Sequence, residues 1–149
     1  TLHTNTAAGA VVRMQDMGVE SYLITSSVNG VLAQRLVRTL CTHCKTPDQP
    51  SDELRRRTGL GRFLAEGQPI YQAVGCSQCR NTGYQGRTGI YELLVADDAI
   101  RALVHRQAAE SEIRAHALAG GMVLMRDDGE RLVRAGVTTR EELLRVTRD

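Results

Sequence analysis

The chain has 149 residues, of which 42% are hydrophobic and 24% are charged, and its formal net charge is +2. This composition is normal for one soluble globular domain or two small ones, and so weak a charge gives little support for a polyanionic partner. No apolar run approaches the roughly 20 residues that a membrane span needs, and no signal segment opens the sequence. Because the first residue is Thr rather than Met and lies inside an organised stretch, we expect a fragment of a longer protein.

The N-terminal part of the chain predicts a helix and then a strand. Thr6 is a plausible N-cap, apolar residues recur at helical spacing over 7–17, and Gly18 is a natural stop. Residues 20–28 are ambiguous, because they fit either a second helix or a strand that enters an Asn-Gly turn. The branched side chains of residues 30–40 predict a strand that runs into the first cysteine pair.

Residues 45–69 are polar, rich in Gly and Pro, and too poor in apolar side chains to form a large core of their own. Ser51 is a candidate cap for one short helix over 52–57. Residues 70–74 then fit a short strand that leads into the second cysteine pair. We expect a cross-link at the base of this segment to keep it ordered.

The rest of the chain predicts one strand followed by helices. Residues 88–95 are strand-like, and the segment before them is punctuated by glycines. Asp97 or Asp98 is the expected cap of the first helix, and Thr138 with Glu141 matches a capping box for the last. The helices are expected over 99–107, 110–121, 126–136 and 138–146.

The four cysteines form two C-x-x-C pairs, and the chain has no others. Two residues between thiolates let both sulfurs of a tight knuckle face one ion, and two knuckles complete a tetrahedral four-sulfur site. The spacing therefore predicts a structural zinc ion held by Cys41, Cys44, Cys76 and Cys79. A closed site of this kind has no open position for water, so we do not expect the metal to be catalytic.

Three other interpretations of these cysteines stay open at this point. Iron, bound as in a rubredoxin-like site, would use the same spacing. Disulfides would require an oxidising compartment, for which nothing else in the sequence argues. Four ordinary thiols are the plainest alternative.

Several residues near the cysteines have expected roles around a metal. His43 lies inside the first knuckle and is expected to be exposed, because four sulfurs already suffice. Arg38, Lys45 and Arg80 are close enough in sequence to offset the negative charge of the thiolates.

A zinc module that binds nucleic acid is an alternative function that the composition disfavours. The sequence has four Tyr, one Phe and no Trp for base stacking, and Lys45 is its single lysine. Its arginines are interleaved with acidic residues, whereas binding to a phosphate backbone needs several uncompensated cations on one face. We therefore expect no nucleic-acid partner.

Three stretches, at residues 1–18, 30–45 and 75–94, together resemble the C-terminal part of the type II secretion and type IV pilus assembly ATPases. They read TLHTNTAAGAVVRMQDMG, GVLAQRLVRTLCTHCK and GCSQCRNTGYQGRTGIYELL. The tetracysteine loop is similar to that of the type II secretion branch, and the resemblance covers essentially the whole chain.

The resemblance implies an α/β fold in three consecutive parts. Residues 1–40 would be the end of a RecA-like P-loop ATPase core, 41–79 a tetracysteine zinc-binding subdomain, and 80–149 a return strand with a helical C-terminal region. The intact protein would be a hexamer in the cytoplasm, peripheral on the face of the inner membrane, that powers pseudopilus assembly for type II protein secretion. Its implied partners are the other subunits of the hexamer and the inner-membrane secretion platform.

The resemblance also points to residues near a nucleotide. The segment TLHTN resembles the His box of the family, which places His3 near the γ-phosphate. Arg87 lies on a segment whose glycines let the backbone approach closely, and it is a candidate nucleotide-binding cation. Gln34 and Arg35, next to the predicted strand, are candidate polar contacts at the same pocket. P-loop catalysis depends mostly on positioning and electrostatic stabilisation of the phosphates, which such groups supply.

One departure from the family pattern limits what this chain should do alone. It contains no G-x-x-x-x-G-K-[ST] segment, and no acidic cluster precedes TLHTN where a Walker B carboxylate for Mg²⁺ would lie. ATP and Mg²⁺ are therefore expected only in the full-length protein, and this chain alone is expected to be catalytically inactive. A freestanding zinc-stabilised module that binds a secretion-platform protein remains an alternative.

Overall fold

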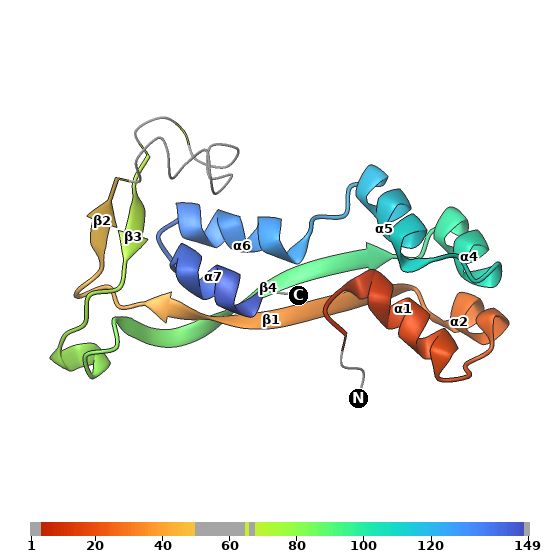
Figure 1. Ribbon diagram of the computed structural model, residues 1–149, viewed down its shortest axis with the longest axis horizontal. Coiled ribbons are helices and arrows are strands. Elements are labelled where there is room, and N and C mark those ends of the chain that lie inside the picture. Colours follow the sequence, from red (N-terminus) through yellow and green to blue (C-terminus); the bar gives the residue numbers. More distant parts are fainter. Residues whose placement is uncertain (1–3, 50–64, 66–67, 148–149) are drawn as a thin grey trace. The chain divides into compact units, whose positions relative to one another are not determined.

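The computed structural model describes residues 4–49, 65 and 68–147 (Figure 1). The contacts between its residues divide the chain into two compact units. The first unit contains Thr1–Gln34 and Tyr91–Met125, and the second contains Arg35–Ile90 and Arg126–Arg148. His3 and the helix expected over 52–57 lie outside the described residues. The expected α/β class is confirmed, while the division into three consecutive parts remains a prediction about the intact protein.

The described residues form two sheets of two strands each, and both are antiparallel. The strand β1 (Gly30–Leu40) pairs with β4 (Tyr84–Val95), and β2 (Thr46–Asp48) pairs with β3 (Ile70–Gln72). β1 matches the strand expected over 30–40, and β3 falls within the one expected over 70–74. β4 begins four residues before the expected 88–95, and β2 was not predicted.

Two backbone hydrogen bonds at the ends of the longer sheet set its direction. The amide of Ala96 donates to the carbonyl of Asn29 (3.0 Å), and the amide of Cys41 donates to the carbonyl of Gly83 (2.9 Å). Because the residue number rises on one strand as it falls on the other, β1 and β4 run antiparallel. This register brings the end of β1 that carries the first cysteine pair beside the start of β4.

The first unit has an apolar core shared by its helices and β4. Its helices are α1 (Ala7–Asp16), α2 (Ser21–Ser27), α4 (Asp98–His105) and α5 (Glu110–Ala119). The buried core residues are Ala7, Ala8, Val11, Ile24, Leu94, Ile100, Val104, Ala108, Ile113 and Ala117. With no aromatic ring among them, this core depends on small and branched aliphatic side chains.

Local signals explain where these helices begin. The Thr6 hydroxyl accepts a hydrogen bond from the Gly9 amide (2.9 Å), and the Asp97 carboxylate accepts one from the Ile100 amide (2.7 Å). These contacts confirm Thr6 as an N-cap and select Asp97 over Asp98. Residues 20–28 prove to be helical, because α2 buries Ile24 in the core. No helix in the described ranges combines the length and the apolar character needed to span a bilayer.

The second unit combines the cysteine knuckles with a pair of C-terminal helices. They are α6 (Met125–Arg134), whose first residue belongs to the first unit, and α7 (Arg140–Val146). Gly129 of α6 faces the side chain of Leu143 on α7, and a Cβ at Gly129 would overlap that side chain. A larger residue at position 129 would therefore require the Leu143 side chain to shift.

A buried carboxylate ties α7 to β1. The Glu142 side chain accepts hydrogen bonds from the Arg38 amide (3.0 Å) and from the Arg38 guanidinium (2.7 Å). Arg145 donates to the same carboxylate at 2.7 Å. The Arg38 guanidinium also lies 4.0 Å from the centroid of the Tyr84 ring, so one cation joins β1, β4 and α7.

The cap of α7 differs from the expected one. Thr139, not Thr138, is the N-cap, and its hydroxyl accepts from the amide of Glu142 (3.1 Å). The hydroxyl of Thr138 instead donates to the carbonyl of Arg38 (2.8 Å). The expected box of Thr138 with Glu141 is therefore wrong by one residue, because a tertiary hydrogen bond engages Thr138.

We expect Glu142 to make this chain less stable in acid. Arg145, and then Arg38, donates hydrogen bonds that lower the pKa of Glu142 from 4.5 to about 2. A carboxyl whose pKa is lower in the folded state contributes stability above pH 4.5 and loses it as the pH falls toward 2. Because both arginines are partly exposed, Glu142→Gln should lower the free energy of unfolding by about 1–3 kcal/mol at pH 7.

Thermal unfolding of the chain between pH 7 and pH 2 measures this contribution. The wild-type melting temperature should fall more steeply below pH 4.5 than that of Glu142→Gln. The exposed neighbour Glu141 supplies the matched control, and Glu141→Gln should keep the wild-type slope. Equal slopes for the wild type and Glu142→Gln would show that the carboxylate is not held as described.

Candidate metal centre

Two short turns present the cysteines. In the first, which follows β1, the amide of Lys45 donates to the carbonyl of Cys41 (3.0 Å). The second is a single 3₁₀ turn, η2 (Ser77–Cys79), which ends at Arg80 with a left-handed backbone (φ 54°). Gly83 follows with φ 75°, and a Cβ there would meet the backbone of Ala73 at 3.0 Å, so this position requires glycine.

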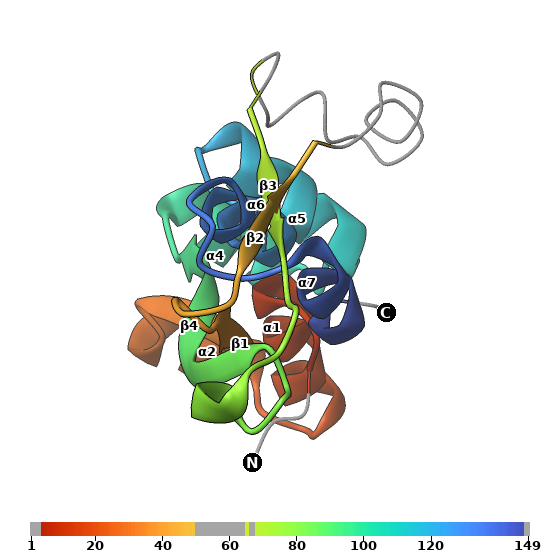
Figure 2. The same cartoon turned by 90° about the vertical axis from the view of Figure 1, so that its left-hand side faces the viewer.

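Cys44 comes two residues before β2, and Cys76 comes four residues after β3, the two paired strands that Figure 2 shows side by side. All four Sγ atoms fall within 4.8 Å of one another. The Cys41–Cys76 pair is separated by 3.9 Å, and the Cys44–Cys79 and Cys76–Cys79 pairs by 3.8 Å. All four cysteines are free thiols in this structure, which contains no disulfide between them.

These separations fit a tetrahedral metal site. With a Zn–S distance near 2.3 Å, the sulfurs of a regular tetrahedron lie about 3.8 Å apart. Three of the six sulfur pairs already have this spacing. The donor set is four thiol groups with no carboxylate or imidazole, which suits zinc or iron better than hard cations such as Mg²⁺.

Backbone amides surround the sulfurs and prepare some of them for ionisation. The amides of Cys76 and Gly83 both donate to the sulfur of Cys79 at 3.2 Å, and the Gly75 amide donates to that of Cys44 at 3.3 Å. Burial raises the pKa of the Cys79 thiol, but the hydrogen bonds from the Cys76 and Gly83 amides lower it. The net effect is a pKa of about 6. For Cys44 burial dominates and raises the pKa to about 12. Metal binding at such a site would release protons.

The cations near the knuckles have other partners than the sulfurs. Lys45 donates to the carbonyl of Gly136 (2.7 Å) and lies 4.7 Å from the centroid of the Tyr71 ring. Arg38 is paired with Glu142, as described above. The expectation that these cations offset thiolate charge stays a prediction, since Arg38 and Lys45 contact other groups. His43 is exposed, as expected.

The predicted nucleotide contacts are spread over both units. Gln34 is exposed at the end of the first unit, while the half-buried Arg35 and the exposed Arg87 belong to the second. Consecutive residues of a strand project to opposite faces, so Gln34 and Arg35 cannot both reach a ligand on one face of β1. His3 lies outside the described residues, so the structure leaves the roles of all four as predictions.

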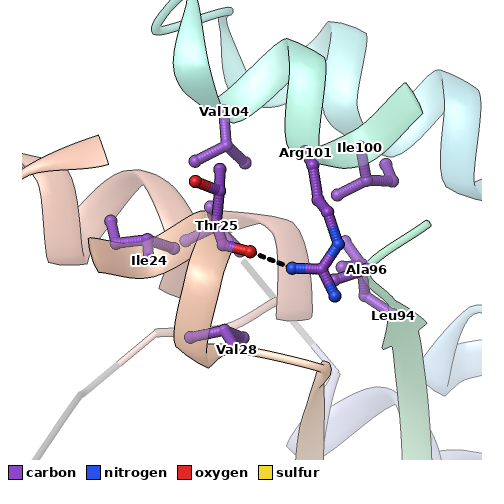
Figure 3. A pocket seen from close by; sticks show the side chains of 9 residues that line it. Ile24, Thr25, Val28, Leu94, Ala96, Ile100, Arg101 and Val104 are labelled. Atoms are coloured by element: carbon purple, nitrogen blue, oxygen red, sulfur yellow. Dashed lines mark hydrogen bonds between the residues drawn. The ribbon is translucent and has the colours of Figure 1, made fainter. Parts of the chain in front are cut away.

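A small apolar cavity lies between α2, α4 and the end of β4 (Figure 3). Its volume is about 10 Å³, and Ile24, Val28 and Val104 are among the side chains around it. The Arg101 guanidinium donates to the carbonyl of Thr25 at its edge. A space of this size holds at most one water molecule, and its apolar lining does not favour even that. The cavity is therefore no nucleotide site.

Three buried acidic residues escaped the sequence analysis, namely Glu92, Glu130 and Glu142. Glu92 of β4 is only 3% exposed, and it shares the covered face of the strand with Ile90 and Leu94. No alternation of apolar and polar residues over 90–94 signals this position, because the apolar Tyr91 and Leu93 lie on the exposed face of β4.

The chain is similar to secretion and pilus proteins. The family model described as "Type II/IV secretion system protein" matches residues 1–145. Type II secretion system protein HxcR of Pseudomonas aeruginosa is 52% identical over 149 residues, which is 100% of this chain and 28% of that protein. Type II secretion system ATPase E of Vibrio cholerae is 50% identical over 149 residues, which is 100% of this chain and 29% of that protein.

A pilus protein is also similar. Type IV pilus assembly ATPase PilB of Thermus thermophilus is 45% identical over 144 residues, which is 97% of this chain and 16% of that protein. The chain therefore spans less than a third of the length of the curated relatives it matches.

We expect the purified chain to bind one metal ion through the four sulfurs. Native mass spectrometry should show one ion in the wild type, and its mass distinguishes zinc from iron. Cys76→Ser should lose the ion, because a closed site needs all four thiolates. The exposed neighbour Ser77 gives the matched control Ser77→Ala, which should keep it.

Loss of the ion should also destabilise the β2–β3 sheet, while the first unit should keep its stability. Amide exchange in peptides covering Thr46–Asp48 and Ile70–Gln72 should speed up in Cys76→Ser, while α1 stays protected. A wild-type mass equal to that of the metal-free chain with four free thiols, in a buffer without chelator, would contradict the prediction.

Proposed function

This chain belongs to the type II/IV secretion system protein family, and we propose that it is the zinc-binding C-terminal portion of an ATPase that powers type II protein secretion. The match of the family model over residues 1–145 carries this proposal. The full-chain identity of about one half to an ATPase of type II secretion supports the choice of branch. The tetracysteine cluster agrees with it, because the sulfurs meet in one place.

We assign the metal a structural role and favour zinc over iron. Zinc has no redox chemistry and accepts four thiolates in a closed tetrahedron, which leaves no position for water or substrate. The sequence between Cys44 and Cys76 is poor in apolar residues, and the described part of it holds only three-residue strands. Cross-linking by one ion at their base would hold this subdomain on the rest of the second unit.

We propose that the intact protein has a RecA-like core and hydrolyses ATP with Mg²⁺. In the three-part division, residues 1–40 end that core, 41–79 form the zinc subdomain and 80–149 return to it and continue as helices. His3 would polarise the terminal phosphate or its attacking water. Arg87 would supply a cation to the nucleotide. Gln34 or Arg35, which project to opposite faces of β1, would be a polar contact beside it.

We propose the cellular setting of this activity from what the family resemblance implies. The working form would be a hexamer, peripheral on the cytoplasmic face of the inner membrane, that moves a secretion platform and so assembles pseudopilin subunits. No nucleic acid is needed for this role. This chain has no phosphate-binding loop, so we propose that it contributes positioning groups to a reaction whose phosphate cradle lies elsewhere in the protein.

ATP hydrolysis by the intact protein tests the proposed function. The intact protein should hydrolyse ATP in the presence of Mg²⁺, whereas the 149-residue chain alone should not. Arg87→Ala in the intact protein should lower kcat/KM on the order of 100-fold, because it removes a cation from the phosphates. Arg114 of α5 is also exposed, and Arg114→Ala should leave the rate unchanged.

Two outcomes would count against this assignment. Sustained hydrolysis by the 149-residue chain would show that the phosphate-binding groups lie within it. An Arg87→Ala protein as active as the wild type would remove Arg87 from the nucleotide site.

A further inference from the structure

Glu92 is a buried carboxylate whose role is not explained by the metal centre or by the proposed nucleotide contacts. Its Oε1 atom accepts a hydrogen bond from the amide of Ala7 (2.9 Å). Its Oε2 atom accepts one from the amide of Met125 (3.3 Å). Ala7 is the first residue of α1 and Met125 the first residue of α6, so one side chain holds the starts of two helices.

The cost of burying this group shows that the two contacts matter. A carboxylate taken out of water is strongly destabilising unless hydrogen bonds or opposite charges replace its hydration. No ion pair reaches Glu92 from the described residues, so the two amides take that place. Both belong to helix N-termini, where unpaired N–H groups and the helix dipole favour a negative charge.

A second acidic side chain, Glu110, contacts the residue that precedes α1. The hydroxyl of Thr6 accepts from the amide of Gly9 and donates to the Glu110 carboxylate at 2.6 Å. Thr6 and Ala7 are adjacent, so two acidic side chains from different elements hold two consecutive residues. The backbone at this point therefore has little freedom to shift while both contacts last.

We propose that Glu92 is a positioning residue for ATP hydrolysis, which acts by fixing the start of α1 and the segment Thr4–Thr6 before it. The proposal rests on the proposed function, in which His3 contacts the nucleotide. Ala7 is four residues after His3, and a chain spans at most about 3.3–3.6 Å per residue. A fixed amide at Ala7 therefore limits where the described residues Thr4–Thr6 of the His box can lie. A catalytic group displaced by about 1 Å can lose on the order of 100-fold in rate.

Substitution of Glu92 in the intact protein tests the role directly. Glu92→Gln keeps the shape of the side chain, but its amide nitrogen cannot accept the second N–H. Glu92→Ala removes both acceptors. We expect kcat for ATP to fall roughly tenfold in Glu92→Gln and further in Glu92→Ala, with KM within about twofold of the wild type. Glu112 is exposed on α5, and Glu112→Gln should match the wild type.

Amide exchange in the same proteins measures the structural step. Peptides that cover Thr4–Ala10 should exchange faster in Glu92→Gln than in the wild type, while peptides of α4 should not change. A residue that only stabilised the fold would lower the melting temperature but leave kcat unchanged well below it. A fall in kcat at constant KM, with faster exchange confined to the start of α1, would support positioning.

Thr6 provides a second route if the Glu92 variants do not fold. Thr6→Ala removes the other contact to the start of α1, and Thr6→Ser keeps the hydroxyl. We expect Thr6→Ala to lower kcat several-fold at constant KM, and Thr6→Ser to restore most of it. Equal kcat values in the wild type, Thr6→Ala and Thr6→Ser would overturn the inference.

The outcomes separate the inference from the function on which it rests. Hydrolysis by the wild type with the same kcat in Glu92→Gln would overturn the positioning role alone. An intact wild-type protein that does not hydrolyse ATP would overturn the proposed function and this inference with it.

Discussion

The hydrogen bond from the Cys41 amide to the Gly83 carbonyl anchors the register on which the metal centre depends. Cys41 follows β1 directly, and Gly83 directly precedes β4. A shift of one residue in this pairing would turn every side chain of one strand to its other face. It would also move the two knuckles past each other, although their sulfurs must meet within a few ångström. Strand register and metal geometry therefore constrain the same few residues.

Three buried glutamates show how this chain uses negative charge. Glu92 accepts two helix-start amides, and Glu142 accepts an amide and two guanidinium groups. Glu130 differs, because its Oε2 atom is buried without a hydrogen-bond partner in the described part of the chain, and burial raises its pKa. The first two fix local geometry at the start of α1 and α6 and on β1. Glu130 makes no such contact through Oε2 in the described part of the chain, so we assign it no role in positioning a helix or strand.

Local sequence patterns predicted most helices and the long strands, and they failed where two local choices were equivalent. Thr138 with Glu141 and Thr139 with Glu142 both match a capping box, since each Thr precedes a Glu by three residues. Only the tertiary structure distinguishes them, because Arg38 engages both the Thr138 hydroxyl and the Glu142 carboxylate. Residues 20–28 were equally undecided until the burial of Ile24 favoured a helix.

The candidate sites also differ in how far the sequence alone could predict them. The cysteine cluster was predictable because residue type and C-x-x-C spacing identify its four ligands, even though 31 residues separate the two pairs. Glu92 was not, since its partners are backbone amides 85 and 33 residues away, which no side-chain pattern reveals. A buried glutamate in a strand must find hydrogen-bond donors to replace its hydration. For Glu92 the starts of α1 and α6 supply them, so the need of one side chain fixes two helix starts.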